Sequence, residues 1–395
     1  MDRTLRIAHC VESYAPALGG MPEGVKQLSE RMAAMGHQVT VLTSNHPKRM
    51  AGKMNGVTIQ GFDITGNAVD GIQGDSSSYV HSLRTGGFDI VTFFAAQQWA
   101  TDAALPHLAE LSARNVFVPT GFSALHQPRW ASYFAQMPDH MRRMDLNVVH
   151  SNNYQDVRFA RAHGVTNLLL IPNGASAEEF DGPANHSFRT AHGIRPDQLM
   201  VLHLGGYTGI KGHREALAIF IKANTGNAVL ALIGSGNAKL KQLFHSHWRY
   251  FLLRWQARTK GKQVLFLELD RATTVEALKE ADLFLFPSNV ECSPIVLFEA
   301  MAAGVPFLSS NAGNAAEITE WSLGGWIIPG TRDARQYEHP NINMGARILG
   351  ELLADGSKRS AAAKQGHAAW RDRFTWQLIT EQYVKAYREL LRETP

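Results

Sequence analysis

Two glutamates, Glu291 and Glu299, stand eight residues apart in a segment that leads from a hydrophobic stretch into a predicted helix. Glu299 opens the sequence Glu-Ala-Met-Ala-Ala-Gly, in which small and apolar residues leave a charged side chain few polar neighbours. A buried carboxylate needs specific partners, and sugar hydroxyl groups would be suitable ones. The pair therefore indicates a site for a polyhydroxylated ligand, with two solvated surface glutamates as the alternative.

The start of the same helix is a predicted anion site. Residues 283–286 form a continuous apolar run that predicts a buried strand, and a helix is expected to begin beyond it, with Ser293 as N-cap and Pro294 at the first helical position. A helix that begins at the carboxyl end of a parallel strand offers unpaired N–H groups and the positive end of its dipole. We expect a phosphate there. The residues predicted to bind it through their backbone are Ser293, Pro294, Ile295 and Val296.

A glycine-rich loop with one lysine follows another predicted strand, at residues 200–204. Lys211 lies in this loop with glycines on both sides, and the carboxyl ends of parallel strands share one edge of a sheet. Its ammonium group could therefore neutralise the same phosphate, the alternative being a solvated loop lysine. Gly234, after the strand predicted at 229–233, is expected to approach the ligand or simply to form a tight turn.

The composition indicates a soluble globular protein of two domains. The chain has 395 residues, of which 45% are hydrophobic and 19% charged. A formal charge of +4 and a pI near 9.0 allow an anionic ligand or an acidic membrane surface as a partner, and they do not indicate nucleic acid. The first ten residues lack the pattern of a signal peptide, and no apolar run reaches the about 18 residues of a membrane span, so a cytoplasmic protein is predicted.

Residues that could bind a metal are sparse in the sequence. The only cysteines, Cys10 and Cys292, are far apart, which disfavours both a disulfide framework and a metal-binding cysteine cluster. No Asp-x-Asp sequence stands at the end of a predicted strand. We therefore expect no metal and a diphosphate held by amides and lysine.

Strands and helices alternate along the whole chain, which is typical of open, mainly parallel α/β sheets. The first unit is a strand at 5–11, a loop that contains Gly19 and Gly20, a helix at 23–35 and a strand at 39–43. The full Gly-x-Gly-x-x-Gly fingerprint of a dinucleotide site is absent from this loop. Further strands are predicted at 57–62, 89–94, 115–119, 146–150, 168–171, 264–267, 306–309 and 325–328.

The polar passage 175–197 is the predicted linker between two Rossmann-like, doubly wound domains that face a central cleft. The expected domains are residues 1–180, with a C-terminal helix at 375–395 packed back on them, and residues 181–374. The polar segment 67–78 is predicted to be a loop. Residues 240–258 predict a basic, aromatic, amphipathic helix, which either lies on an anionic membrane surface or packs on its own sheet.

These features together resemble the family-4 retaining glycosyltransferases of GT-B fold. The resemblance covers almost the whole chain, and its most specific element is Glu291-x7-Glu299 running into Glu-Ala-Met-Ala-Ala-Gly-Val-Pro. The other matching segments are Gly19-Gly20, Ile171-Pro-Asn-Gly174, Lys211-Gly212 and Gly313-Asn-Ala-Ala-Glu317. The family implies a metal-independent, retaining, hexosyltransferase-like enzyme of surface polysaccharide or glycolipid biosynthesis. Its co-substrate is a nucleoside-diphosphate sugar, its acceptor a hydroxyl group, and its place the cytoplasm or the inner face of the membrane.

The resemblance also implies a role for each matching residue. Glu299 would bind the ribose hydroxyls of the donor, Glu291 would lie by the sugar ring, and Lys211 would bind the diphosphate together with the amides at 293–296. Such an arrangement suits the reaction, because breaking a sugar–phosphate bond develops negative charge on phosphate oxygens. Glu291 need not be a covalent nucleophile, and the spacing of the two carboxylates does not establish the acid and nucleophile pair of a glycosidase.

Two positions depart from the family pattern. Gly206 stands where the family has an arginine that binds the diphosphate, and Arg271 and Arg214 are the candidates to replace it. The histidine expected in the first domain is missing, and Gln97 and His126 are the candidates for its place. These departures keep two alternatives open: a protein of the same fold that binds nucleotides without turnover, and a nucleotide-sugar epimerase.

Overall fold

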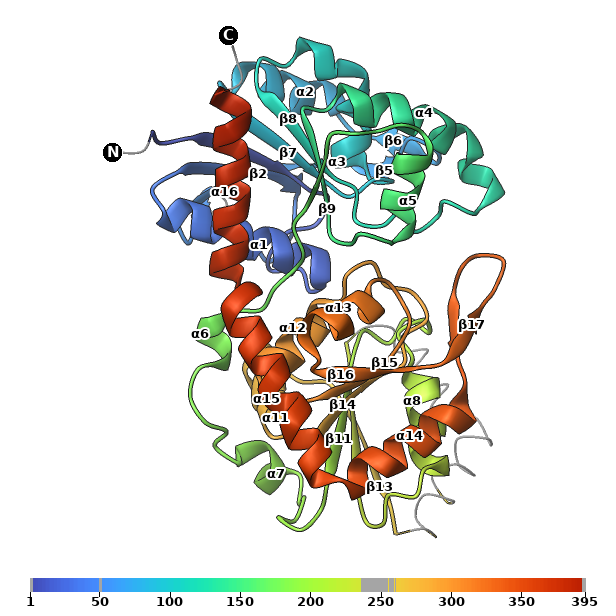
Figure 1. Ribbon diagram of the computed structural model, residues 1–395. Coiled ribbons are helices and arrows are strands. Elements are labelled where there is room, and N and C mark those ends of the chain that lie inside the picture. Colours follow the sequence, from blue (N-terminus) through green and yellow to red (C-terminus); the bar gives the residue numbers. More distant parts are fainter. Residues whose placement is uncertain (1–2, 50–51, 236–254, 256–258, 260, 393–395) are drawn as a thin grey trace. The chain divides into compact units, whose positions relative to one another are not determined.

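The computed structural model describes residues 3–49, 52–235, 255, 259 and 261–392. They form two compact units, of which unit 1 is Met1–Asn173 with Trp376–Pro395 and unit 2 is Gly174–Thr375 (Figure 1). The basic, aromatic helix predicted over 240–258 falls outside the described residues except for the exposed Trp255. Each unit is an α/β layer built on a parallel sheet, so the predicted fold class is confirmed.

The described part of unit 1 contains an eight-stranded sheet in the order β10-β9-β8-β7-β1-β2-β4-β3. All neighbouring strands are parallel except β3 and β4. Its strands are β1 (Arg6–Cys10), β2 (Gln38–Ser44), β3 (Gly52–Met54), β4 (Val57–Phe62), β7 (Ile90–Phe94), β8 (Arg114–Val118), β9 (Leu146–Val149) and β10 (Leu168–Leu170). The central strand β7 is buried along its whole length, as expected for a parallel sheet covered by helices.

Helices of unit 1 come from both ends of the chain. They are α1 (Gly20–Ala34), α2 (Ser76–Thr85), α3 (Trp99–Asp102), η1 (Leu105–Glu110), η2 (Pro128–Trp130), α4 (Ala131–Arg143), α5 (Gln155–Ala162) and α16 (Trp376–Arg392). The C-terminal helix α16 contacts α1, and the Tyr387 hydroxyl lies 2.7 Å from Thr92 Oγ1 of β7. This buried hydrogen bond ties the end of the chain to the centre of the sheet of unit 1.

The described part of unit 2 contains a six-stranded parallel sheet in the order β13-β12-β11-β14-β15-β16. Its strands are β11 (Met200–Leu204), β12 (Val229–Ile233), β13 (Gln263–Leu267), β14 (Leu283–Phe286), β15 (Phe307–Ser310) and β16 (Gly325–Ile328). The first strand lies in the middle, between the second and the fourth, so the winding direction reverses beside β11. Ligands of doubly wound sheets bind at the carboxyl ends of the two strands at such a switch point.

Helices cover both faces of this sheet (Figure 1). One face packs α8 (His213–Lys222) and α14 (Ile342–Ala354) through residues such as Leu217 and Leu349. The other packs α11 (Arg271–Lys279), α12 (Ile295–Ala302), α13 (Ala315–Ser322) and α15 (Gly356–Arg373). The described part of the unit also contains α6 (Ala177–Phe180), α7 (Ser187–Ala191) and the hairpin of β17 (Gly330–Arg332) and β18 (Glu338–Pro340).

Two segments predicted to be irregular contain regular elements. The predicted loop at 67–78 is wrong in part, because it contains the second strand of the hairpin β5 (Thr65–Asn67) and β6 (Gly71–Gln73) and the start of α2. Asp75 caps that helix, since its carboxylate accepts hydrogen bonds from the N–H groups of Ser77 and Ser78. The polar passage at 175–197 contains the short helices α6 and α7.

Candidate active site

The candidate site is built by the two loops that follow β11 and β14, the strands at the switch point of unit 2. The loops are joined by a hydrogen bond from Asn289 N–H to the Ile210 carbonyl oxygen, at 2.9 Å, and Ser288 Oγ lies 3.2 Å from the same oxygen. Gly212 makes this approach possible. Its φ of +78° favours glycine, and a Cβ atom there would lie 2.3 Å from the Pro287 carbonyl oxygen.

Lys211 and Glu291 form an ion pair across these loops, with Lys211 Nζ 2.8 Å from Glu291 Oε1. Ser288 Oγ donates a second hydrogen bond to the same carboxylate oxygen, at 2.7 Å. The Glu291 side chain is 11% exposed and that of Lys211 is 31% exposed. The carboxylate is thus held inside the loop, while the ammonium group remains accessible and carries N–H groups that an anionic ligand can share.

The loop after β15 supports Glu291 from another side. Gly313 has a φ of +62°, and a Cβ atom there would lie 2.4 Å from the Cys292 carbonyl oxygen. Asn314 N–H donates to that same oxygen at 2.9 Å. The Gly313-Asn-Ala-Ala-Glu317 segment therefore fixes the backbone next to Glu291, and glycine is required where the two loops touch.

Helix α12 begins at Ile295, one residue later than predicted, and Pro294 occupies the N-cap position in place of Ser293. The prediction that the Pro294 backbone donates to an anion is also wrong, because proline has no N–H group. The N–H groups of Ile295 and Val296 lie in the first turn, where they have no acceptor within the helix. The helix therefore retains an anion-binding end directly after the Glu291 loop.

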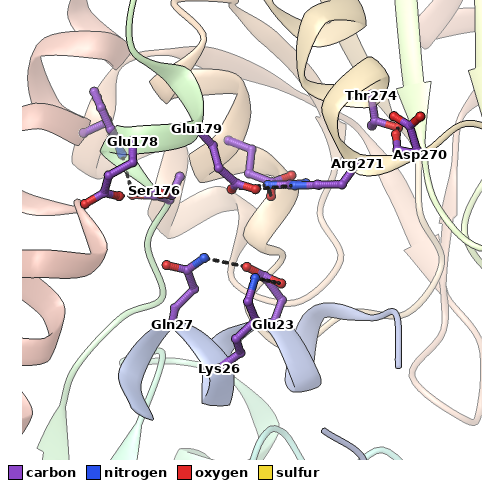
Figure 2. A network of polar contacts seen from close by, with 12 residues as sticks. Glu23, Lys26, Gln27, Ser176, Glu178, Glu179, Asp270, Arg271 and Thr274 are labelled. Carbon is purple, nitrogen blue, oxygen red and sulfur yellow. Dashed lines mark hydrogen bonds and ion pairs between the residues drawn. The ribbon is translucent and has the colours of Figure 1, made fainter. Parts of the chain in front are cut away.

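Glu299 lies one turn further along α12 and is 4% exposed. Its Oε1 accepts a hydrogen bond from Arg271 Nη2 at 2.6 Å. Arg271 is the first residue of α11 and also binds Glu179 of α6, with Nε–Oε1 and Nη2–Oε2 distances of 2.9 and 2.7 Å (Figure 2). Burial alone would lower the pKa of Arg271, but the two carboxylates outweigh burial and raise it, so the guanidinium stays charged.

The structure shows the surroundings of three further residues that the sequence singles out. Arg271, a candidate to replace the diphosphate-binding arginine, has two carboxylates as partners, and Arg214 is exposed on α8. Gly234 N–H donates to the Leu267 carbonyl oxygen at 3.0 Å, and so this amide is used within the protein. A Cβ atom at Gly234 would lie 2.3 Å from the Gly205 carbonyl oxygen, which makes close packing of the loops the role of this glycine.

Two histidines beneath the Lys211 loop are uncharged at neutral pH. His203 on β11 and His213 at the start of α8 are buried, with ring centroids 4.4 Å apart. His203 Nδ1 lies 2.9 Å from the Leu285 carbonyl oxygen. Burial lowers the pKa of His203 to about 4 and the pKa of His213 to about 2. Neither histidine therefore replaces the missing arginine as a cation.

The remaining predicted residues lie in unit 1. Gly19 is the N-cap of α1 and Gly20 its first residue, and both are exposed. The φ of +149° and ψ of 163° at Gly19 belong to a region that is almost restricted to glycine. His126 is exposed in the turn before η2. Gln97 follows β7, where its N–H donates to the Tyr133 hydroxyl at 3.0 Å and its Oε1 accepts from Ala124 N–H at 3.3 Å.

The loops after β7 and β8 of unit 1 contain features that the sequence did not reveal. Four residues there other than glycine have a positive φ: Ala95, Gln97, Thr120 and Phe122. Nearby, the buried Asp102 accepts from the Tyr133 hydroxyl at 2.7 Å and from Ala68 N–H at 2.9 Å. Burial raises the pKa of Asp102. Strained backbone of this kind concentrates at functional sites.

Two residues of unit 2 were also missed by sequence reasoning. Ser288 lies three residues before Glu291, but a serine in a turn carries no signal that it will donate to that carboxylate. Glu179 lies in a polar passage, 92 residues from Arg271, and no spacing links the two. Within the ranges the structure describes, no cluster of three or more His, Cys, Asp or Glu could hold a metal ion, and no helix there is long and apolar enough to cross a membrane.

Comparisons with known proteins agree with this architecture. Residues 185–340 match the family model of glycosyl transferases group 1. An uncharacterized glycosyltransferase of Methanocaldococcus jannaschii is 28% identical over 230 residues, which are 56% of this chain and 54% of that protein. The chain thus spans about half the length of this curated relative.

Two solved structures share the fold over almost the whole chain. Sucrose-phosphate synthase of Thermosynechococcus elongatus has a TM-score of 0.79 and 19% identity, with 99% of this chain and 100% of that chain covered. HepE of Anabaena, solved in complex with UDP-glucose, has a TM-score of 0.74 and 16% identity, with 98% and 100% covered. The GT-B fold is thereby confirmed. Residues 185–340 are thus similar to the glycosyl transferases group 1, in agreement with the family resemblance that the sequence predicts.

Proposed function

We propose that this protein is a retaining glycosyltransferase that moves a sugar from a nucleoside-diphosphate sugar to a hydroxyl group of an acceptor. The observation that carries the proposal is the Lys211–Glu291 ion pair at the switch point of unit 2, next to the first turn of α12. An accessible cation beside free helix amides is suited to a diphosphate. The group 1 match over residues 185–340 supports the same reaction class.

The leaving diphosphate is the centre of the proposed mechanism. When the bond between the anomeric carbon and the phosphate oxygen breaks, negative charge develops on that oxygen. The Lys211 ammonium group and the N–H groups of Ile295 and Val296 stabilise this charge, and they are already in place before the bond breaks. The acceptor hydroxyl attacks on the face that the diphosphate leaves and passes its proton to the departing phosphate oxygen, so the configuration of the anomeric carbon is retained.

Glu291 has an orienting role in this mechanism. Its Oε1 is engaged by both Lys211 and Ser288, so the carboxylate keeps the ammonium group in place and presents its other oxygen to the hydroxyls of the donor sugar. Glu299 binds the ribose hydroxyls of the donor. Because lysine and amides supply the positive charge, the reaction needs no metal ion. UDP-glucose, the ligand in the HepE structure, makes UDP-sugars the first donors to test.

We assign the acceptor to unit 1, where the strained loops after β7 and β8 lie. The product is a glycoconjugate such as a surface polysaccharide or a glycolipid. Gly206 is the observation that favours a second candidate function, the binding of nucleotides without turnover, because the residue supplies no cation where the family pattern has an arginine.

A turnover assay distinguishes these functions. The purified protein is incubated with UDP-, GDP- and ADP-sugars and a panel of hydroxyl acceptors, in the presence of a chelator, and both nucleotide release and the glycosylated product are measured. A transferase forms product of retained configuration with the chelator present. Nucleotide binding without release from any donor would support the binding protein, and a changed donor sugar without acceptor would support an epimerase. Activity that is lost in chelator and restored by Mg²⁺ or Mn²⁺ would overturn the metal-independent mechanism.

A further inference from the structure

Glu299 is part of a chain of three charged side chains. The Glu299 side chain is 5% exposed and its Oε1 is bound by Arg271, while Glu179 holds the other edge of the same guanidinium with two hydrogen bonds. A two-point contact of this kind fixes the plane of the guanidinium, which a lysine could not do. Figure 2 shows Arg271 extended from the start of α11 toward Glu179 of α6.

We propose that Arg271, held by Glu179, is a positioning residue that orients the Glu299 carboxylate toward the ribose hydroxyls of the nucleotide, and that Arg271 does not bind the diphosphate. This inference rests on the proposed function, because Glu299 is the ribose-binding residue of that proposal. Glu179 and Arg271 thereby determine how strongly the protein prefers a ribose that carries both hydroxyl groups.

The charge of the cluster supports this role. One guanidinium between two carboxylates leaves a net charge of about −1, which repels a diphosphate and suits neutral hydroxyl groups. A buried carboxylate requires a partner of opposite sign, and Arg271 supplies one to Glu299. Within the described residues, Arg271 contacts only one oxygen of Glu299, and the second oxygen is left to accept from a ribose hydroxyl.

A purely structural role for the cluster makes a different prediction. Arg271 could serve only to join α6 to α11 and α12, and its removal would then destabilise the protein and weaken all ligands alike. A positioning role requires a selective effect, confined to ligands that carry the ribose hydroxyls. Binding of UDP and of 2′,3′-dideoxy-UDP therefore separates the two roles, because the ligands differ only in those hydroxyls.

The main variant is the double substitution Glu179→Gln and Arg271→Gln, which removes the clamp and keeps the net charge of the cluster at about −1. Arg271→Lys is the second variant, since it retains the charge, loses the planar fork and serves if the double variant does not fold. Arg189→Gln is the matched control. It breaks the 2.7 Å pair of Arg189 with Asp282, whose carboxylate also accepts from Met200 N–H at the amino edge of the same sheet.

Dissociation constants are measured by calorimetry for UDP, 2′,3′-dideoxy-UDP and pyrophosphate. Loss of a charge-assisted hydrogen bond lowers affinity by about 10- to 100-fold. We therefore expect the affinity of the double variant for UDP to fall by that factor. Its affinities for the dideoxy ligand and for pyrophosphate should fall by less than about threefold. In Arg271→Lys the affinity should fall for UDP alone, and by less than in the double variant. Arg189→Gln should not change the affinity for any one ligand relative to the others.

Equal losses for UDP and dideoxy-UDP in either variant would overturn the positioning role. A pyrophosphate affinity that falls as far as the UDP affinity would instead assign Arg271 to the diphosphate. Failure of the proposed function has a separate signature, because the wild-type protein would then bind none of UDP, GDP and ADP. That result would overturn both proposals.

Discussion

Replacement of Lys211 by methionine is the sharpest test of the proposed chemistry, because it removes the ammonium group and keeps most of the apolar stem. Glu291 retains its hydrogen bond from Ser288 Oγ in this variant. The Lys211 side chain is 31% exposed, and ion pairs that reach solvent contribute about 0–1 kcal/mol to stability. For a chain of this size we therefore expect the melting temperature to fall by no more than about 4 °C.

The effect on turnover should be much larger than the effect on stability. A unit positive charge about 4 Å from a developing negative charge contributes about 4 kcal/mol at an effective dielectric constant of about 20. Removal of one such preorganised group from other enzymes lowers kcat by about 10²–10³-fold. We expect a decrease of that size for Lys211→Met. The loss should appear in kcat, because the charge that Lys211 stabilises is greatest in the transition state.

The assay measures nucleotide release from the donor that the wild-type protein accepts, at saturating concentrations of donor and acceptor. Lys211→Arg should recover part of the activity, since it returns a cation to the loop. Lys222→Met on α8 is the matched control, because it removes a lysine whose Nζ, among the described residues, binds only the exposed Asn343 Oδ1, at 2.9 Å. A folded Lys211→Met protein with kcat within about threefold of the wild-type value would refute the role of the ammonium group.

Two further predictions concern the same loop and the strand beneath it. Gly206→Arg should tighten UDP binding by about tenfold and raise turnover, with Gly206→Gln as the uncharged control. The described atoms nearest to a Cβ atom at this position are Ser235 O and Thr208 Cγ2, both at 3.6 Å. An unchanged affinity would show that no cation is missing. His203 and His213 should make the protein acid-sensitive. Their pKa values in the folded protein, about 4 and about 2, lie below the ordinary 6.5. The contribution of the two histidines to the free energy of unfolding is therefore fully present above pH 6.5 and decreases as the pH falls toward those values. His203 accounts for up to about 3 kcal/mol of this loss, and melting curves of wild type and His203→Gln between pH 7 and 4 should show a shallower decline in the variant.

Much of the fold follows from the sequence because buried parallel strands are continuous apolar runs. The bounds predicted for β4, β11, β12, β14 and β16 coincide with those observed. The closeness of Lys211 and Glu291 also follows from a general rule, since both loops leave the carboxyl edge of one sheet and their strands are neighbours. The error at α12 is of one residue and arises because Ser293 and Pro294 both favour positions near a helix start.

What the sequence could not reveal is the electrostatic setting of its charged residues. In the sequence, Arg271 is simply a positively charged residue. Because Gly206 stands where the family has an arginine, Arg271 is a candidate to bind the diphosphate in its place. In the folded protein its Nε and Nη2 donate to Glu179, and Nη2 also donates to Glu299. The two carboxylates outnumber the guanidinium, so the net charge of the three groups is negative. That outcome depends on where α6 packs, which no periodicity encodes. The carboxylates that surround a cation, and not its presence in the sequence, therefore decide whether it suits a diphosphate: Arg271 has two such partners and Lys211 has one.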